Sequence, residues 1–485
     1  MRIFIIIFLL VVATAAVFPF IVGSKVETQL RQRVAEFDGL PVYMLEVKSY
    51  EKGYLSSEAV VSLGFDQAAL DGLIEEMEVP SEDSVKEALE SFDIHFDIQH
   101  GPVLTKHGFG LGWTDMQSSF DSETYPEYTE VFEALGHDLL LDWSMRLGLD
   151  GAGWMKTHVP DIDASVEEDG EEIQLVVSGF EGLTDFKEYG VSISSQGGVK
   201  EFSVNVDAEE GMEFSLKDMR LDAEFTYTDS ILISLGTMEM GIESLRVTGD
   251  NLGFANMDGL VLHAVISEGI SAETMSVRES IRMESADFNG YKVEDAEFAF
   301  AYVNIAKSVF ETYMEATDFI LSADSEEEIN AELGKRFEPV LKEALTYDPK
   351  FELESVAFKS DDGSLKASGS IGIDSSLVGP DVDFENPYVL IPAVNILADV
   401  EMSESLVKTL LRQRVRSEMA AGLEDGSVDE EQVTQMVDMQ IGMMAGPLEQ
   451  QGYIERDGDN YSVVFSFENG AAAVNGVPIP IPGLF

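Results

Sequence analysis

Six histidines and a large excess of carboxylates are the groups in this chain that could carry chemistry. The histidines lack the close spacing of a metal-binding motif, and no G-x-x-x-x-G-K-[ST], G-x-S-x-G or H-E-x-x-H motif is present. His100 precedes Gly101 and Pro102, where its imidazole is either a general base or a partner of the backbone at a turn. His95 falls on the polar side of an alternating stretch and is expected to be solvated. The sequence predicts no catalytic residue, and we expect no enzyme activity.

Acidic clusters such as DIDASVEEDGEE at 161–172 and DGDN at 457–460 raise the question of a calcium site. An EF-hand loop needs glycine at its sixth position, and counting from Asp161 that position is Val166. Because 91 Asp and Glu residues recur along the chain, acidic turns arise by chance, and we expect neither a metal nor a cofactor. Paired carboxylates for glycoside hydrolysis meet only in space, so a hydrolase of envelope polymer that uses carboxylates or His100 is an open alternative.

The composition excludes several classes of partner and site. The 485 residues carry 30 Lys and Arg against 91 Asp and Glu, which gives a net charge of −61. Such a surface repels nucleic acid, so we expect no nucleic-acid partner. The absence of cysteine excludes disulfides, thiolate metal sites, cysteine nucleophiles and a lipidated cysteine. The 45% of hydrophobic residues allows a sizeable core, in two or three domains or in one elongated body.

The N-terminus carries the longest apolar stretch of the sequence. Ile3–Val22 contains no charged residue, and a helix of this length crosses the hydrocarbon core of a bilayer. Arg2 precedes it, which favours a cytoplasmic N-terminus and export of the rest of the chain. The sequence Ala-Thr-Ala at 13–15 resembles the cleavage site of a signal peptide, but apolar residues continue well beyond it. We therefore expect an uncleaved transmembrane anchor at 1–23, with cleavage as the alternative.

The secondary-structure elements expected to position His100 follow the anchor in the sequence. We expect a short helix over 24–37 and then a β-hairpin, whose strands at 42–50 and 54–65 meet at a three-residue turn, 51–53, with Gly53 in the left-handed conformation. The second strand of the hairpin has one apolar face, formed by Ala59, Val61, Leu63 and Phe65. A strand over 92–99 then leads into His100. Further helices are expected at 67–78, at 81–91 and at about 126–146.

The remainder of the chain predicts a body made mainly of antiparallel strands. Short alternating segments divided by Gly, Asp and Asn run from 161 to 303. The fold class is therefore α+β, with an N-terminal transmembrane helix followed by an elongated, mainly antiparallel β-sheet body with helical insertions. Changes of pattern mark regions that are either domains or layers of one body: the anchor at 1–23, an α+β region at 24–160, the meander at 161–303, a helical segment at 304–350, and an α+β region at 351–485 that contains two helices and closes with a hairpin turning at Asn469-Gly470.

Several of these pieces, in this order, resemble the YdgA family of bacterial proteins of unknown function. They are the N-terminal span, SYEKGYLSSEAVVSL at 49–63, IQHGPVL at 98–104 and GYIERDGDNYSVVFSFENGAAAVNG at 452–476. The resemblance implies a protein anchored in the bacterial inner membrane with its soluble body in the periplasm. It brings no established catalytic residue. The positions that match the family motifs are expected to be structural: Tyr50, Gly53, Ser56, Ser57, His100, Gly101 and Pro102.

Three functions are compatible with the sequence. The first is a non-enzymatic protein that acts by contact, in envelope maintenance or as a scaffold, and exposed strand edges make a homo-oligomer reasonable. The second is a carrier or conduit for lipid or another apolar molecule, because a long curved sheet can line an apolar groove. Strands such as FTYTDSILISL at 225–235 carry more apolar residues than a one-sided sheet needs. The third is the envelope-polymer hydrolase, and we rank the three in this order.

Overall fold

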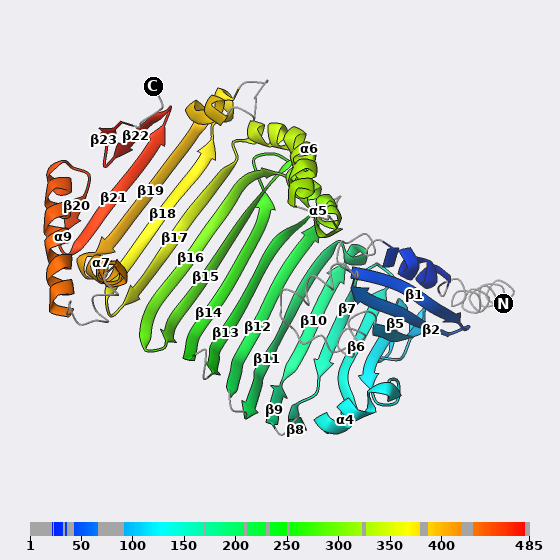
Figure 1. Cartoon of the computed structure of the whole chain (residues 1–485). Coiled ribbons are helices and arrows are strands. Elements are labelled where there is room, and N and C mark those ends of the chain that lie inside the picture. Colours follow the sequence, from blue (N-terminus) through cyan, green and yellow to red (C-terminus); the bar gives the residue numbers. More distant parts are fainter. Residues whose placement is uncertain are drawn as a thin grey trace. The chain divides into compact units, whose positions relative to one another are not determined.

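The structure is a computed structural model of the whole chain (Figure 1). Apart from Val22, the expected anchor at 1–23 lies outside the described residues, as do the expected helices at 67–78 and 81–91. No helix in the described part of the chain is long and apolar enough to cross a membrane. The described residues are 22, 24–32, 34–35, 43–65, 92–168, 171–207, 211–228, 233–249, 253–322, 326–378, 387–418 and 430–480.

The chain divides into two compact units. Unit 1 comprises Met1–Gly236 and Phe310–Lys335, and unit 2 comprises Thr237–Val309 and Arg336–Phe485. The helices α5 (Lys307–Ser322) and α6 (Glu326–Ala344) confirm the helical segment that the sequence predicts after residue 304.

Unit 1 is built on an antiparallel sheet in which most strands pair with a near neighbour in sequence. The strands β1, β2, β3, β5, β6, β7, β10, β11 and β12 pair in that order. A hairpin of β8 and β9 pairs with the second half of β11. The expected hairpin and the strand leading to His100 are confirmed. The bounds are β1 (Tyr43–Lys52), β2 (Ser56–Phe65), β3 (Phe92–His100), β4 (Val103–Leu104), β5 (Gly110–Asp121), β6 (Leu139–Gly148), β7 (Gly153–Val159), β8 (Ile162–Glu168), β9 (Glu171–Ser178), β10 (Phe180–Lys187), β11 (Ser192–Asp207) and β12 (Met212–Tyr227).

The helix expected at about 126–146 is wrong for most of its length. Only the 3-10 turn η1 (Pro126–Tyr128) and the short helix α4 (Thr129–Leu135) are helical, and the strand β6 follows. Gly136 ends α4 in the left-handed conformation, with a φ of 70°. Beyond this residue the chain pairs on both sides, with β5 and with β7. Cross-strand pairing therefore decides the conformation of this segment, whose apolar residues at 141, 143, 145 and 147 alternate as in a strand.

Unit 2 contains a second run of antiparallel strands. Together with β8 to β12 these strands confirm the expected meander, although many are longer than the short segments that the sequence suggested. The strands β14 to β19 pair in sequence order, β21 pairs with β19, and β20, β22 and β23 extend this C-terminal part. The bounds are β13 (Ser234–Gly249), β14 (Gly253–Glu268), β15 (Thr274–Phe288), β16 (Tyr291–Ala306), β17 (Lys350–Ser360), β18 (Gly363–Ile373), β19 (Val394–Ser403), α7 (Glu404–Glu418), α9 (Glu430–Gln450), β20 (Glu455–Asp457), β21 (Asn460–Glu468), β22 (Ala471–Val474) and β23 (Val477–Ile479).

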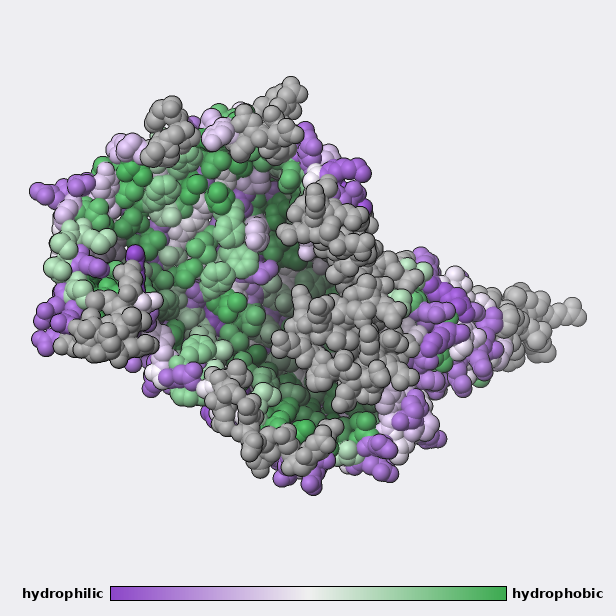
Figure 2. All heavy atoms as spheres, viewed as in Figure 1, coloured by the Kyte–Doolittle hydropathy of each residue, from purple (hydrophilic) through white to green (hydrophobic). Residues whose placement is uncertain are grey.

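One face of the unit 2 sheet is apolar, and several of its side chains are nearly half exposed to solvent. Figure 2 shows hydrophobic side chains gathered over the strands that Figure 1 labels β14 to β19. On β16, Phe298 and Tyr302 are 43% and 44% exposed, and the rings of Tyr302 and Phe351 lie 5.1 Å apart across the β16–β17 pair. The opposite face carries ion pairs such as Arg282 Nε to Glu297 Oε1 at 2.9 Å. Period-two alternation therefore sorts apolar and charged side chains onto opposite faces.

Candidate functional site

The helix that precedes β1 lies against the apolar face of the unit 1 sheet. Val26 and Leu30 pack on a core cluster formed by Ala59, Ile98 and Met116. Polar contacts hold the helix in place at two points, since Lys52 Nζ donates to Ser24 Oγ at 2.8 Å and Arg31 Nη1 donates to the carbonyl oxygen of Val47 at 3.5 Å. The described part of the expected 24–37 helix is confirmed, and it forms a second layer over the strands.

A cavity of about 920 Å³ lies between this helix and the sheet. Its volume is in the range of small-molecule binding sites, and its wall is mainly aliphatic, aromatic and methionine side chains. No Asp or Glu is present among the described residues that line it, although the chain has 91 of them. The lining residues are Lys25, Val26, Thr28, Gln29, Leu30, Phe96, Trp113, Thr114, Met116, Trp143, Met145, Leu147, Met155, Thr184, Phe186, Tyr189, Gly190 and Ile193.

The few polar groups in the cavity wall already have partners or lie at its exposed rim. Thr114 Oγ1 donates to the carbonyl oxygen of Gln99 at 3.0 Å, and the hydroxyls of Thr184 and Ser195 are 3.0 Å apart. Lys25 is the single charged residue of the described wall, and its Nζ lies 5.3 Å from the centre of the Trp113 ring. The cavity therefore offers apolar surface with one cation, which suits an apolar chain with or without an anionic group.

The residues that match the family motifs meet beside this cavity, at one end of β2 and β3. Ser57 Oγ and His100 Nε2 are 2.9 Å apart. The amide of Gly53 donates to the carbonyl oxygen of Ser56 at 2.8 Å and closes the expected hairpin, but the expected left-handed conformation of Gly53 is wrong, since its φ is not positive. Tyr50 packs against the core cluster under the helix. Residues of the motifs at 49–63 and 98–104 thus lie close together in the folded chain.

Gly101 and Pro102 connect this group of residues to β5. The amide of Gly101 donates to the carbonyl oxygen of Trp113 at 2.8 Å, and the amide of Gly112 donates to the carbonyl oxygen of Pro102 at 3.1 Å. A Cβ atom on residue 101 would lie 1.8 Å from the carbonyl oxygen of Gly112, so only glycine permits this close approach of the two backbones.

Ser57 and His100 are residue types that serve as nucleophile and general base, but their environment differs from that of a catalytic pair. Both residues are buried, with 2% and 1% of their surface exposed. Within the described part of the chain no carboxylate bonds to Nδ1 of His100, the position where a catalytic triad places its orienting acid. Burial lowers the pKa of His100, which favours the neutral ring. We therefore interpret the pair as a buried hydrogen bond that links β2 to β3.

Burial of neutral histidines predicts a loss of stability in weak acid. Burial lowers the pKa of His100 and of His107 below the ordinary 6.5, so below that pH the unfolded chain binds protons that the folded chain does not. The free energy of unfolding of unit 1 should fall as the pH is lowered from about 7 to about 5. Urea unfolding across this range should show a shallower fall in His100→Gln than in the matched variant of the exposed His95, His95→Gln. Equal slopes in the two variants would contradict the assignment.

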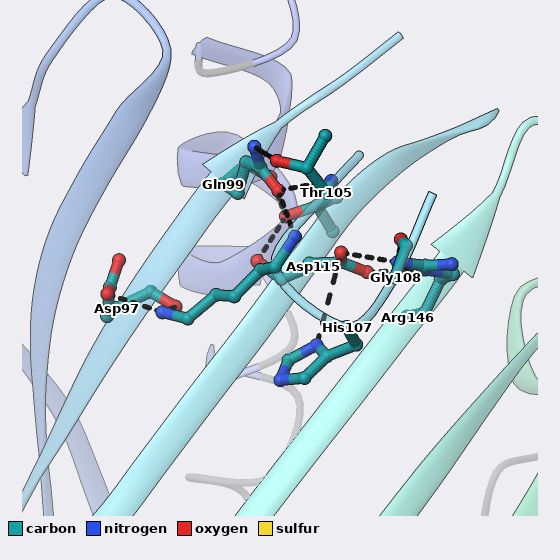
Figure 3. Close-up of polar contacts among 9 residues, drawn as sticks. Asp97, Gln99, Thr105, His107, Gly108, Asp115 and Arg146 are labelled. Carbon is teal, nitrogen blue, oxygen red and sulfur yellow. Dashed lines mark hydrogen bonds and ion pairs between the residues drawn. The ribbon is translucent and has the colours of Figure 1, made fainter. Parts of the chain in front are cut away.

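A buried ion pair lies on the opposite face of the same strands (Figure 3). Asp115 on β5 is fully buried and faces Arg146 on β6, with Nε to Oδ1 at 2.6 Å and Nη2 to Oδ2 at 2.7 Å. The bidentate pairing with Asp115 raises the pKa of Arg146. Arg146 Nη2 also donates to the carbonyl oxygen of Gly108 at 2.8 Å. The pair therefore fastens the 105–109 loop to the sheet.

The same loop is held at its other end by side chains of β3 (Figure 3). Gln99 Oε1 accepts from the amides of Thr105 and Lys106 at 2.9 and 3.0 Å, and Lys106 forms an ion pair with Asp97. His107 Nδ1 is 3.9 Å from Asp115 Oδ2. All these contacts join the loop to β3, β5 or β6, so we interpret this polar cluster as structural. The candidate site is the apolar cavity on the other face of the sheet.

The other residues considered from the sequence lie away from this cavity. His95 is exposed, as expected, with its ring 5.3 Å from that of Tyr125. In the acidic stretch at 161–172, Asp161 Oδ1 accepts from the amide of Gly179 at 2.7 Å. No group of three potential metal ligands occurs in the ranges that the structure describes. The sequence analysis missed the cavity because its wall is contributed by a helix and several strands that are distant in sequence.

Comparison with known proteins gives one match. A family model described as a bacterial protein of unknown function (DUF945) covers residues 2–482. No curated protein and no solved structure matches the chain.

Proposed function

Because this chain belongs to DUF945, a bacterial family of unknown function, we propose a function from its own geometry, namely that it binds and carries the apolar part of a lipid or a similar amphiphile. The observation that carries the proposal is the cavity of about 920 Å³, whose described wall is mainly apolar and free of carboxylates. Each methylene group that enters such a site contributes about 0.8 kcal/mol. Lys25 at the rim suits an amphiphile with an anionic group.

The sheet of unit 2 supports a carrier in a second way. Its apolar face leaves Phe298, Tyr302 and Ile371 between 43% and 47% exposed, on the strands β16 and β18, which both pair with β17. Large contiguous apolar surfaces are rare on monomeric soluble proteins and mark binding surfaces. This face is a second apolar surface for acyl chains, and it belongs to unit 2 alone.

We further propose the location that such a carrier needs. Ile3–Val22 has the length and composition of a transmembrane anchor, which would hold the body at the periplasmic surface of the bacterial inner membrane, close to a source of lipid. The YdgA assignment belongs to the same proposal, since it rests on the motifs at 49–63, 98–104 and 452–476.

A scaffold that acts by contact is the second candidate, and the apolar face of unit 2 is the observation that favours it. Self-association through this face would give the homo-oligomer that the sequence suggested, against the repulsion of a net charge of −61 on each copy. The mass of the detergent-extracted native protein distinguishes the two candidates, because a lipid adduct supports the carrier and a lipid-free oligomer supports the scaffold. The hydrolase hypothesis gains no support from the Ser57–His100 pair, because both side chains are buried.

Tryptophan fluorescence tests the proposed cavity directly. Trp113 and Trp143 line it, and Trp154, the third and last tryptophan of the chain, lies on the opposite face near Arg146, which is 5.9 Å from its ring centre. We expect dibromostearate, a fatty-acid anion with a contact quencher on its chain, to quench the full-length protein. Trp154→Phe should keep this quenching, whereas Trp113→Phe with Trp143→Phe should remove most of it. Quenching that survives in the double variant would place the ligand elsewhere, and no quenching in the unmodified protein would refute the proposal.

A further inference from the structure

Exposed apolar side chains gather in the turns at one end of the unit 1 sheet. Leu55 lies in the β1–β2 turn and is 58% exposed, while Phe109 and Leu111, at the start of β5, are 82% and 60% exposed. Tyr54, Val103, Leu149, Tyr189 and Val191, in the neighbouring turns and strand ends, are also exposed. In a chain this rich in acid, we call these eight residues the apolar end.

Hydrogen bonds show that these turns lie next to one another. The amide of His100 donates to the carbonyl oxygen of Leu55 at 2.7 Å, and Val103 pairs with Leu111. Trp113 Nε1 donates to the carbonyl oxygen of Leu149 at 3.2 Å. The amide of Tyr189 donates to the carbonyl oxygen of Gly151 at 2.8 Å, which brings the next turn into the same row. The apolar end is therefore a contiguous edge, and its turns are pinned by backbone bonds.

The chain enters unit 1 at this edge. Ser24 is held by Lys52, which directly precedes the β1–β2 turn, and Lys25 lies over Trp113. The uncharged stretch Ile3–Val22 ends two residues before Ser24. Tyr189 of the apolar end lines the cavity, as does Trp113, whose Nε1 donates to Leu149 of the apolar end. The start of the described chain, the exposed apolar turns and the cavity thus lie at the same end of unit 1.

We propose that the apolar end is seated in the interfacial layer of a lipid bilayer. Exposed leucine and phenylalanine side chains gain free energy when they enter the acyl region, because their apolar surface is removed from water. Tyrosine and tryptophan favour the headgroup level, and lysine side chains close to it keep their ammonium groups in water. A second copy of the chain is the less favoured occupant because each copy carries a net charge of −61. This inference does not require that the cavity holds a ligand.

The absence of native cysteine allows a single label to test the contact. The full-length variant Leu55→Cys, carrying an environment-sensitive fluorophore, is reconstituted in phosphatidylcholine vesicles that contain a lipid with a nitroxide on its acyl chain. We expect strong quenching of this label. The same label on Val131→Cys should remain unquenched, because Val131 is exposed on α4, beyond the other end of β5. The length of β5 separates the two positions by about 40 Å.

A second substitution separates insertion from mere proximity to an anchor. Phe109→Ser in the Leu55→Cys background should reduce the quenching at least twofold, whereas Val131→Ser should leave it unchanged. Both native residues are exposed, so neither change empties a core. An unquenched label at 55, or quenching that Phe109→Ser does not alter, would overturn the proposal. Energy transfer between labelled copies in detergent, without lipid quenching in vesicles, would assign the apolar end to self-association and overturn it equally.

Discussion

Replacing Arg146 by methionine should lower the free energy of unfolding of unit 1 by about 3–5 kcal/mol, the usual effect of leaving a buried charge without its partner. Asp115 is fully buried, and Arg146 supplies its bidentate hydrogen bonds. The change also removes the bond to Gly108 that holds the loop. Urea unfolding followed by tryptophan fluorescence measures the loss, because Trp113, Trp143 and Trp154 are all in unit 1.

The double variant Arg146→Met with Asp115→Asn is the control for this prediction. It removes both charges, so much of the stability lost in the single variant should return, because the main penalty comes from the isolated carboxylate. Arg31→Met removes an exposed ion pair with Glu27 at 3.3 Å and an exposed, long hydrogen bond of 3.5 Å to Val47, and should change stability by less than about 1 kcal/mol. A loss in Arg146→Met as small as that in Arg31→Met would contradict the prediction that the buried Asp115 side chain depends on Arg146.

Filling the cavity should weaken amphiphile binding at least tenfold. Met155 on β7 lines the cavity between Met145 and Thr184, its partners on the neighbouring strands. A tryptophan at this position occupies space that two or more methylene groups of a ligand would use, and each contributes about 0.8 kcal/mol, whereas 1.4 kcal/mol is tenfold in affinity. Calorimetric titration of full-length Met155→Trp with stearate measures the effect.

Lys156→Trp is the matched control, since the next residue of the strand points to the opposite face and does not line this cavity. We expect its affinity to equal that of the unmodified protein. Thermal unfolding of both variants checks that the fold is retained, and an extra ring that enters existing space should cost little stability. Equal affinities of the two variants for stearate would move the binding site away from the cavity.

Local signals in the sequence were sufficient for the turns and for much of the secondary structure. Gly53 closes the first hairpin, and Asn469-Gly470, with φ angles of 51° and 76°, turns the terminal one. Alternation predicted strands on both sides of these turns because it reflects the two faces of a sheet. The segment Leu139–Gly148 was wrongly expected to be helical because it is rich in leucine and aromatic residues, although its apolar residues at 141, 143, 145 and 147 alternate as in the strand that pairs with β5 and β7.

By itself the sequence determined the absence of cysteine chemistry, the strong negative charge, the antiparallel character of the body and the positions of its sharpest turns. These properties depend on composition or on residues a few positions apart. Only the tertiary structure decided that Ser57 meets His100, that Asp115 meets Arg146, and that a helix and distant strands enclose an apolar cavity. Such contacts depend on which strands pair and in which register, and those choices are set by the packing of the whole unit.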